Sequence, residues 1–492
     1  MSTENTSKPA YQPSLFRNWM SLTGLVIVIG SLFSFFLLFM LDAVAHFSNP
    51  YIGILTYIIA PAFLIFGLLL TVTGLLRERR KRGGAISLVP PVQIDLSRPR
   101  DKRILGYFIA GSLFFLFLSA VGSYNTYHFS ESVQFCGQTC HTVMKPELIT
   151  YQHGPHARVA CVECHIGPGA AWFVKAKLSG TYQVYATLAK KYPTPIPTPV
   201  KNLRPAQETC EQCHWPKKFA GNLDRTYNYF LGDETNTPFT VRLVLKVGGG
   251  DPTHGPMGGI HWHMNVANKI EYIATDNERQ KIPWVRRIDS QGVVTEFRSP
   301  RFTNDVSQFA NRIRRMDCMD CHNRPAHTYD TPDDAVSLAM SLGRIDRSLP
   351  YIKTNALYVL TKPYADQTQA LQGIATLLSE RYPSKPGIRQ AIDAVQQIYT
   401  NNFFPEMKAS WQAYPNNIGH KDWPGCFRCH DGQHKAPDGI RTIKASDCNT
   451  CHTILAQGSG AELEQLTPNG QKFKHPGDPV DGACNDCHSG GL

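Results

Sequence analysis

Every cysteine of this chain lies in a pair that is followed directly by a histidine. Six of the seven pairs have the spacing Cys-x-x-Cys-His, and the first has three residues between its cysteines. This pattern is typical of c-type haem attachment, in which two thiols form thioethers to the porphyrin and the adjacent imidazole binds the iron. The sets, numbered here as motifs 1 to 7, are Cys136, Cys140 and His141; Cys161, Cys164 and His165; Cys210, Cys213 and His214; Cys318, Cys321 and His322; Cys426, Cys429 and His430; Cys448, Cys451 and His452; and Cys484, Cys487 and His488.

Paired cysteines also occur in zinc sites and in thioredoxin-like redox sites. Neither kind of site explains a histidine after each of seven pairs, and no cysteine remains for a structural disulfide. The motifs therefore predict seven covalently bound c-type haems, with their iron, as the cofactors.

Eleven histidines lie outside the motifs and could supply second axial ligands. A six-coordinate haem iron transfers electrons and has no open position for a substrate. His46 ends the first apolar run and is the least suitable of the eleven, which also include His128, His153 and His254. The histidines that we expect to bind haem iron are His156, His261, His263, His327, His420, His434 and His475.

Motif 1 differs from the others in its longer spacer and in Met144, which follows it closely. A thioether ligand from this methionine would raise the potential of the haem. The alternative is that Met144 only fills space in the packing. Either His141 or Met144 could hold the first iron.

Three long runs without a formal charge predict membrane-spanning helices over residues 20–41, 51–76 and 104–124. About 20 apolar residues cross a bilayer core as a helix. Only 18% of the chain is charged, below the roughly 25% of soluble domains. Buried core helices, or a cleavable signal in the first run, are the alternatives. The first run is longer than the roughly 7–15 residues of a signal core, which favours a retained anchor.

The basic residues indicate how these helices are oriented. The loop 77–103 carries nine Lys and Arg residues, whereas Asp42 to Pro50 has none. Basic loops stay in the cytoplasm, so everything after about residue 125 is expected in the periplasm, where c-type haem is attached. The formal net charge of +11 is explained by haem propionates and lipid headgroups. We expect membrane and no nucleic acid as a partner.

The chain is predicted to be a membrane-anchored multihaem cytochrome, with a loop-rich, mainly α haem domain that contains a small β insert. Runs such as Phe239–Val247 are typical of strands. Thr331-Pro332 is a helix start signal, and the apolar residues from Ala370 to Glu380 have helical spacing, so both indicate helices. The expected parts are a membrane anchor (1–124), a three-haem region (125–222), a β-rich insert with a His-rich loop (223–317), haem 4 with a helical insert (318–403) and a C-terminal three-haem region (404–492).

The segment from Cys140-His-Thr-Val-Met-Lys-Pro-Glu through Gln-His-Gly-Pro-His156, followed by Cys161-Val-Glu-Cys-His-Ile-Gly-Pro-Gly, resembles the NapC/NirT/NrfH family of membrane-anchored quinol dehydrogenases. The resemblance covers roughly residues 104–215. It implies that quinol is oxidised at the first haem, that Met144 and His156 are axial ligands, and that Lys175 or Lys177 lies near the quinol pocket. The whole layout resembles the heptahaem inner-membrane cytochromes of metal-respiring bacteria.

These observations predict a menaquinol dehydrogenase that passes electrons to a periplasmic c-type cytochrome. Quinol oxidation releases protons, so a proton acceptor is needed near the first haem. The candidates are Lys145, Glu147, Lys175 and Lys177, with Glu131 and His128 also near the expected membrane surface. Each could instead be an ordinary interfacial charge. The alternatives are a terminal reductase of a nitrogen or sulfur oxyanion, and a passive electron conduit for a separate quinone-oxidising subunit.

Overall fold

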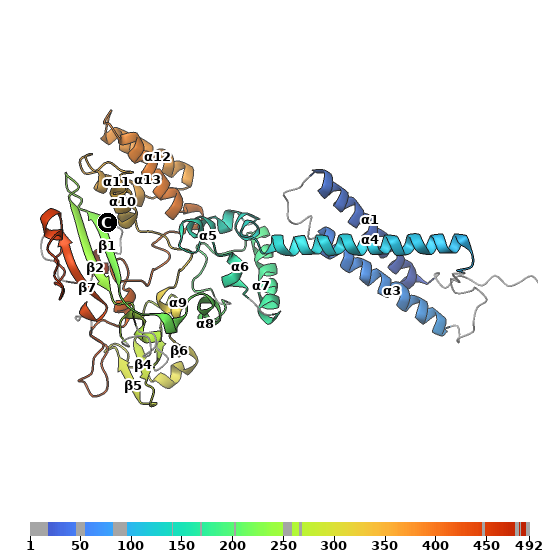
Figure 1. Ribbon diagram of the computed structural model, residues 1–492, viewed down its shortest axis with the longest axis horizontal. Helices are drawn as coiled ribbons and strands as arrows, with labels where there is room; N and C mark the ends of the chain where they lie inside the picture. The colour runs from blue at the N-terminus through green and yellow to red at the C-terminus, as the bar shows by residue number, and fades with distance from the viewer. Residues whose placement is uncertain are drawn as a thin grey trace, which may run out of the picture. The chain divides into compact units, whose positions relative to one another are not determined.

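The computed structural model describes residues 18–45, 55–81, 96–139, 141–167, 170–200, 203–248, 258–264, 268–444, 448–477, 482 and 484–488. The chain forms two compact units, Met1–Thr139 and Cys140–Leu492. The first unit holds long apolar helices and the second holds mixed helices and strands (Figure 1).

Three helices of the first unit are long and apolar enough to span a membrane, as predicted. They are α1 (Trp19–Ala45), a π-helical turn (Leu55–Ile59) that continues into α3 (Ala60–Lys81), and α4 (Pro99–Ser130). The 32 residues of α4 measure about 48 Å at the α-helical rise. This length exceeds the roughly 30 Å hydrocarbon core, so α4 extends beyond the predicted span at both ends.

Small residues let α1 and α3 pack closely. A Cβ atom added at Gly24 would lie 2.4 Å from the Thr71 Oγ1 atom, and one at Gly67 would lie 2.9 Å from the Gly24 carbonyl oxygen. Ser21 Oγ donates to the Thr71 carbonyl at 3.2 Å. Close approach of backbones at small residues, with hydrogen bonds across the interface, is how apolar helices associate in lipid. The three spans are therefore a packed bundle rather than independent anchors, with Ser123 of α4 bonded to the Tyr57 carbonyl.

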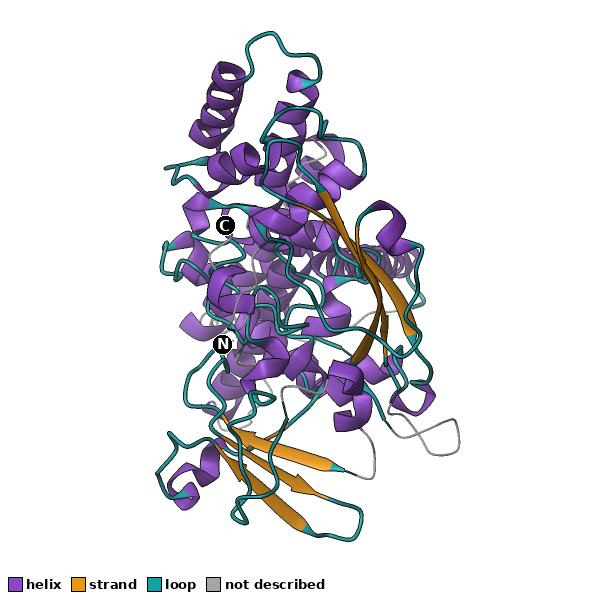
Figure 2. Cartoon of the chain, turned by 90° about the vertical axis from the view of Figure 1, so that its left-hand side faces the viewer, coloured by secondary structure: helices purple, strands orange, loops and turns teal. Residues whose placement is uncertain are grey.

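Two antiparallel sheets form in the second unit (Figure 2). One has the order β1-β2-β7 and the other the order β5-β4-β3-β6. Strands β1 to β6 lie within the expected β-rich insert, but β7 comes from the C-terminal region and begins at the histidine of motif 6. The strands are β1 (Leu223–Phe230), β2 (Pro238–Leu245), β3 (Lys269–Ile273), β4 (Trp284–Ile288), β5 (Val294–Arg298), β6 (Arg314–Arg315) and β7 (His452–Gly458).

Four helices in the predicted helical insert form the largest apolar core of the second unit (Figure 1). Thr331 caps the first of them by accepting from the Asp334 amide, and Asp366 caps the third by accepting from the Gln369 amide. Apolar residues at helical spacing, including Ile374 and Leu378, are fully buried between them. The helices are α10 (Pro332–Ser341), α11 (Ile352–Thr361), α12 (Gln367–Arg381) and α13 (Ile388–Asn402).

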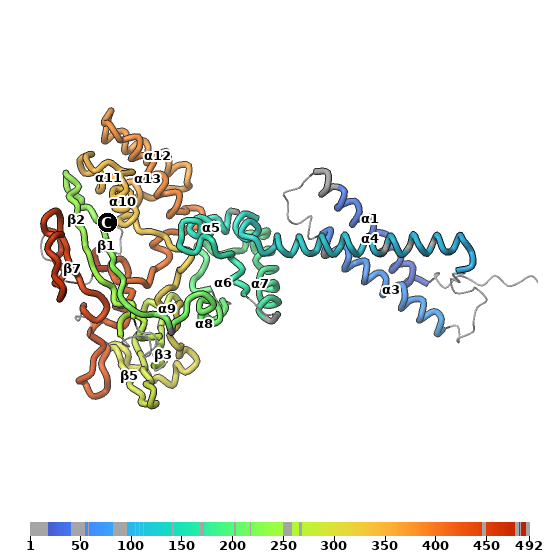
Figure 3. Tube along the Cα trace, viewed as in Figure 1, coloured from blue at the N-terminus to red at the C-terminus, as the bar shows by residue number. Residues whose placement is uncertain are grey.

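The haem motifs lie on short helical turns joined by loops (Figure 3). In a helical turn, residues i, i+3 and i+4 share one face, so Cys-x-x-Cys-His presents both thiols and the imidazole on the same side. Cys136 of motif 1 lies in a π-helical turn, Phe135–Thr139, whose wider winding accommodates one extra residue. The other short elements are α5 (His141–His153), α6 (Cys161–His165), α8 (Ala206–Thr209), α9 (Cys318–Cys321), α14 (Cys484–His488) and the 3₁₀ turns Cys210–Gln212, Gly425–Arg428 and Cys448–Thr450; the longer α7 is Ala170–Leu188.

Candidate haem-binding sites

Among the side chains that the structure describes, six motif histidines each lie opposite one histidine from outside the motifs. The distances between the ring centroids fall between 5.8 and 6.4 Å. The pairs are His165 with His327 (6.4 Å), His214 with His156 (6.1 Å), His322 with His261 (6.4 Å), His430 with His263 (5.8 Å), His452 with His420 (6.2 Å) and His488 with His475 (6.4 Å).

This separation fits one iron between each two rings. An imidazole nitrogen binds a first-row metal at about 2 Å, and the ring centre lies roughly 1 Å further, so two axial imidazoles have centres about 6 Å apart. Burial lowers the pKa of His165, His263 and His430. A lowered pKa favours the neutral imidazole, which is the form that binds a metal. All six pairs therefore have the spacing that six-coordinate haem requires, and burial also favours the metal-binding form of His165, His263 and His430.

The pairing crosses the chain in ways that the motif order does not indicate. His156 precedes motif 2 but lies opposite the histidine of motif 3, and His327 follows motif 4 but lies opposite the histidine of motif 2. His261 and His263 share one 3₁₀ turn, Ile260–Met264, and face motifs 4 and 5 respectively. The predicted His-rich loop thus serves two different sites.

Backbone carbonyls orient three of the distal rings. The Nδ1 atom lies 2.9 Å from a carbonyl oxygen in each case: Pro325 for His156, Val247 for His261 and Ile260 for His263. A hydrogen bond at Nδ1 fixes the tautomer, so that Nε2 carries the lone pair available to the metal.

A carboxylate orients the distal ring of motif 2. His327 Nδ1 lies 2.9 Å from the carbonyl oxygen of Glu147 and 3.1 Å from its Oε2 atom. Arg324 Nη2 donates to both carboxylate oxygens of Glu147 at 3.1 Å. The carboxylate of Glu147, which was a candidate proton acceptor for quinol, is therefore engaged by Arg324 and by the imidazole.

The site of motif 6 has no such partner among the residues that the structure describes. The Nδ1 atoms of His420 and His452 are both buried without a hydrogen bond there. The His420 ring instead stacks on Phe427 at 4.3 Å.

The position of His434 corrects one of the predicted ligands. Its ring is only 2% exposed, its Nδ1 atom lies 2.8 Å from Asp431 Oδ1, and its Nε2 atom lies 2.7 Å from the Ile282 carbonyl oxygen. Both ring nitrogens are occupied, so His434 is a buried structural residue rather than an axial ligand. His153 is bonded similarly, to Ile149 and Asn401.

Three further histidines are candidate iron ligands for the haem of motif 1. His128 packs against the Tyr124 ring within α4, whereas His46 and His254 lie outside the described residues. For motif 1, Cys140 and the side chain of His141 also lie outside them. Met144 is half-buried on α5, three positions after His141.

Contacts connect the first four motifs in chain order. Glu147, on the helix that begins at motif 1, contacts His327 of the motif 2 pair. The thiols of Cys164 in motif 2 and Cys213 in motif 3 lie close enough to interact electrostatically. The side chains of Cys210 in motif 3 and Cys318 in motif 4 interact directly.

The later motifs continue this sequence of contacts. Arg428 of motif 5 donates to the carbonyl of Asp320 in motif 4 at 2.6 Å. Phe427 of motif 5 stacks on His420 of the motif 6 pair. Lys421, which directly follows His420, lies close enough to His488 of motif 7 for its charge to help lower the pKa of that imidazole. These contacts therefore link the sites of motifs 2 to 7 in their sequence order.

Asp320 connects motif 4 to a sheet, a role that sequence reasoning missed. Its side chain is 2% exposed and accepts from Tyr272 at 2.6 Å, from Arg279 at 3.1 Å and from Arg314 at 3.1 Å. The Asp317-x-x-Asp320 capping box at the start of α9 was a visible sequence signal for the local turn, but not for the long-range contacts.

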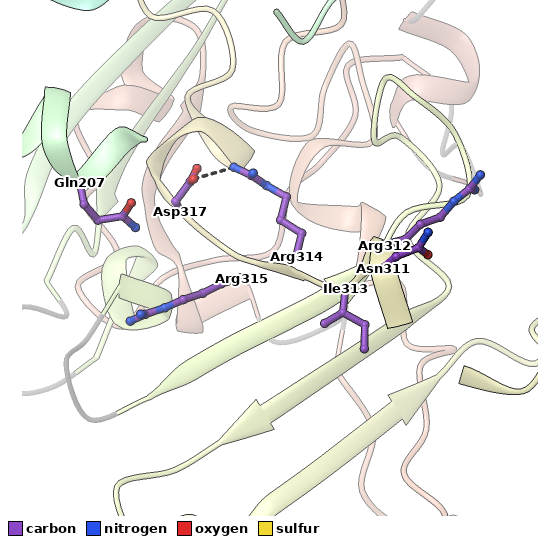
Figure 4. Close-up of a pocket in the computed structure, with 7 residues that line it drawn as sticks. All are labelled: Gln207, Asn311, Arg312, Ile313, Arg314, Arg315 and Asp317. Atoms are coloured by element: carbon purple, nitrogen blue, oxygen red, sulfur yellow. Dashed lines mark hydrogen bonds and ion pairs between the residues drawn. The ribbon is translucent and has the colours of Figure 1, made fainter. Parts of the chain in front are cut away.

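A cationic pocket of about 470 Å³ lies beside motifs 3 and 4. Figure 4 shows Arg315 extending towards Gln207, which precedes motif 3, and Arg312 extending to the opposite side. Arg314 is paired with Asp317 at 2.6 Å. Both neighbouring motif histidines, His214 and His322, belong to imidazole pairs.

The lysines predicted for the quinol site have different surroundings. Lys145 donates to Gln367 at the start of α12. Lys175 and Lys177 lie on α7, where their ammonium groups are 4.7 Å from the Trp172 ring centre and 5.1 Å from that of Phe173. Glu131 follows α4, and its side chain is bonded to the hydroxyl of Tyr127.

Apolar spanning helices joined to repeated Cys-x-x-Cys-His turns with paired imidazoles define a membrane-anchored c-type cytochrome of electron transport. Residues 98–198 match the NapC/NirT cytochrome c family, N-terminal region. The chain is also 40% identical over 495 residues to cytochrome c-type protein ImcH of Geobacter sulfurreducens (strain ATCC 51573 / DSM 12127 / PCA). The aligned region covers 96% of this chain and 95% of the relative. No solved structure matches the chain.

The chain belongs to the NapC/NirT cytochrome c family. Membership confirms the predicted family, covalently bound c-type haem and a role in membrane electron transfer. It also agrees with the three candidate spans in the first unit.

Proposed function

We propose that this protein is a seven-haem menaquinol dehydrogenase that passes electrons from the membrane to a periplasmic c-type cytochrome. The observation that supports this best is the set of six imidazole pairs, each with the spacing that a six-coordinate haem needs. Six-coordinate haems carry electrons without binding substrate. The family resemblance assigns the reaction with quinol to the haem of motif 1.

The first iron is proposed to have one protein ligand from α5. Either His141 or Met144 is the residue that would bind it. The family resemblance favours Met144. A haem held in this way differs in ligand field from the six paired ones, which suits a separate role at the start of the electron path.

Quinol oxidation releases two electrons and two protons for each quinone formed. We assign the electrostatic role near the quinol oxygens to Lys175 and Lys177, because Glu147 is engaged by Arg324 and His327. An ammonium group near a quinol oxygen favours its deprotonated form by Coulomb attraction, and the two released protons pass to water. Haem iron, when present, accepts the electrons one at a time.

The periplasmic location of the haem unit is part of the same proposal. Arg79, Arg80 and Lys81 occupy the last turn of α3, and the basic residues continue to the start of α4. Basic residues between two spans favour the cytoplasmic side for that loop. The haem motifs, which follow the third span, are then placed outside.

The alternative of a terminal oxyanion reductase needs a five-coordinate haem beside a cationic pocket. The Arg312–Arg315 pocket supplies the charge, but the neighbouring His214 and His322 are each paired with a second imidazole. These pairs leave no open iron position there, so the arginines suit haem propionates better than a substrate.

Quinol turnover by the purified full-length chain tests the proposal. The oxidised protein in lipid nanodiscs is mixed with a menaquinol analogue, and haem reduction is followed by stopped-flow absorbance with and without a quinone-site inhibitor. We expect fast, inhibitor-sensitive reduction of several haems, and a roughly tenfold lower rate for Lys175→Met from loss of a charged hydrogen bond. Lys191→Met, at an exposed lysine beyond α7, is the matched control. Reduction by dithionite but not by quinol would favour the passive conduit and contradict the proposal.

A further inference from the structure

Helix α7 carries an apolar stripe whose side chains stay largely exposed among the described residues of its unit. Val174, Leu178, Tyr182, Tyr185 and Leu188 are each between 52% and 75% exposed. Their spacing of four, four, three and three residues places all of them on one side of the helix. Ala186, which lies directly beside the stripe at 100° per residue, is 7% exposed. An exposed apolar stripe of this length is unusual for a surface that faces only water.

The charges on α7 are arranged around this stripe. At 100° per residue, Lys175 projects along one border of the stripe and Lys177 along the other. The helix contains no Asp or Glu, and Lys190 and Lys191 follow its end. The helix therefore combines an apolar face, basic borders and no acidic residue.

These features match a helix that lies flat in the headgroup layer of a membrane. Such helices bury an apolar face at the acyl boundary and pair lysines with anionic lipid. Tyrosines such as Tyr182 and Tyr185 prefer this layer, because the ring is apolar and the hydroxyl is hydrated. Lysine stems can lie along the apolar surface while the ammonium groups reach the headgroups.

We propose that α7 is a second membrane contact of this protein, which binds an anionic phospholipid surface through the stripe Val174, Leu178, Tyr182, Tyr185 and Leu188. The spanning helices hold the chain at a bilayer, so the local lipid concentration is high. The absence of acidic residues on α7 favours anionic lipid over a second copy of the same basic face, since two such faces would repel each other. The inference does not depend on quinol oxidation.

Spin labels on the full-length protein test this contact. Leu178→Cys and Tyr185→Cys place a label on the stripe, and Gln183→Cys places one on the opposite side of the same helix, where the residue is also exposed. In nanodiscs containing phosphatidylglycerol, we expect oxygen to relax the first two labels several-fold more effectively than a water-soluble nickel complex does. The label at 183 should show the reverse preference.

Two outcomes would overturn the proposal. Stripe labels that prefer the nickel complex, as the label at 183 does, would mean that α7 faces water. Stripe labels shielded from both reagents, regardless of lipid composition, would mean that protein covers the stripe instead. Leu178→Glu is a second test, with Gln183→Glu as control and the haem absorbance spectrum as a check of folding. Only the substitution on the stripe should weaken the protection of α7 against hydrogen exchange in the nanodisc.

Discussion

The six imidazole pairs differ in what holds the Nδ1 atom of the distal ring. His156, His261 and His263 use backbone carbonyls, whereas His327 is also within hydrogen-bond distance of the Glu147 carboxylate. A carboxylate draws the Nδ1 proton more strongly and makes the imidazole a better electron donor to the metal. At the scale of single residues, Glu147 is therefore expected to lower the potential of the haem at motif 2.

Replacing Glu147 by Gln should raise the potential of that haem. A tenfold shift in its reduction equilibrium corresponds to about 59 mV for a one-electron couple, and we expect a shift of this order. Potentiometric titration of the whole protein, with the haems resolved by electron paramagnetic resonance, measures it. Glu163→Gln is the matched control, because this glutamate is exposed within motif 2. Equal shifts in both variants would indicate a general charge effect and contradict the role at His327.

Single residues also mark how far the sequence could predict the sites. The motif spacing predicted the six motif histidines that the structure pairs with a second imidazole, and the number of other histidines indicated that such partners exist. The sequence could not separate His434 from the ligands, because its bonds to Asp431 and to the Ile282 carbonyl come from a turn and from a distant chain segment. Long-range packing, rather than residue type, decides which histidine faces an iron.

At the scale of elements, local signals predicted helices well and one strand not at all. The spacing of Ala370 to Glu380 predicted α12, whose capping residue is one position before its start. Strand β7 was missed because its seven residues begin at a haem-motif histidine and pair with β2, more than 200 residues earlier. When a strand is stabilised by pairing with a distant segment, its own sequence need not show a clear alternation of apolar and polar residues.

The helical insert is fixed to strand β1 by a buried charge. Lys353 of α11 is 5% exposed, pairs with Asp333 of α10 at 2.6 Å and also donates to the Phe230 carbonyl. Burial raises the pKa of Asp333, but the ammonium groups of Lys353 and Lys421 outweigh that effect, and the net pKa is lowered. A lowered pKa in the folded state gives stability that is present above the ordinary value of about 3.9 and is lost as the pH falls through the folded value.

Removing Lys353 should therefore destabilise the second unit. Lys353→Met leaves the buried Asp333 with one cation fewer, which we expect to cost about 3 kcal/mol at neutral pH. The loss of stability on acidification should also become shallower. Urea denaturation followed by far-ultraviolet circular dichroism, repeated from neutral to acidic pH, measures both effects. The double variant Lys353→Met/Asp333→Leu should recover part of the stability. An unchanged urea midpoint in the single variant would contradict the structural role of this ion pair.

At the scale of the whole molecule, the contacts between successive motifs predict a single line of haems rather than a branched cluster. Motif 4 lies at the centre of this line, since Cys318 contacts motif 3 and the Asp320 carbonyl accepts from Arg428 of motif 5. The turn that holds His261 and His263 serves motifs 4 and 5 together. Electrons that enter at motif 1 should therefore cross the haem of motif 4 to reach the last three.

A variant without the fourth haem tests this order. In Cys318→Ser/Cys321→Ser, quinol should reduce only the three haems before motif 4 in the fast phase of a stopped-flow experiment, because the remaining path has a gap. Cys484→Ser/Cys487→Ser removes the last haem instead and should leave the other six in the fast phase. Haem content by pyridine haemochrome assay verifies that each variant lacks one haem. Fast reduction of the last three haems in the first variant would show a second route, such as a direct contact between distant motifs, and would exclude the linear order.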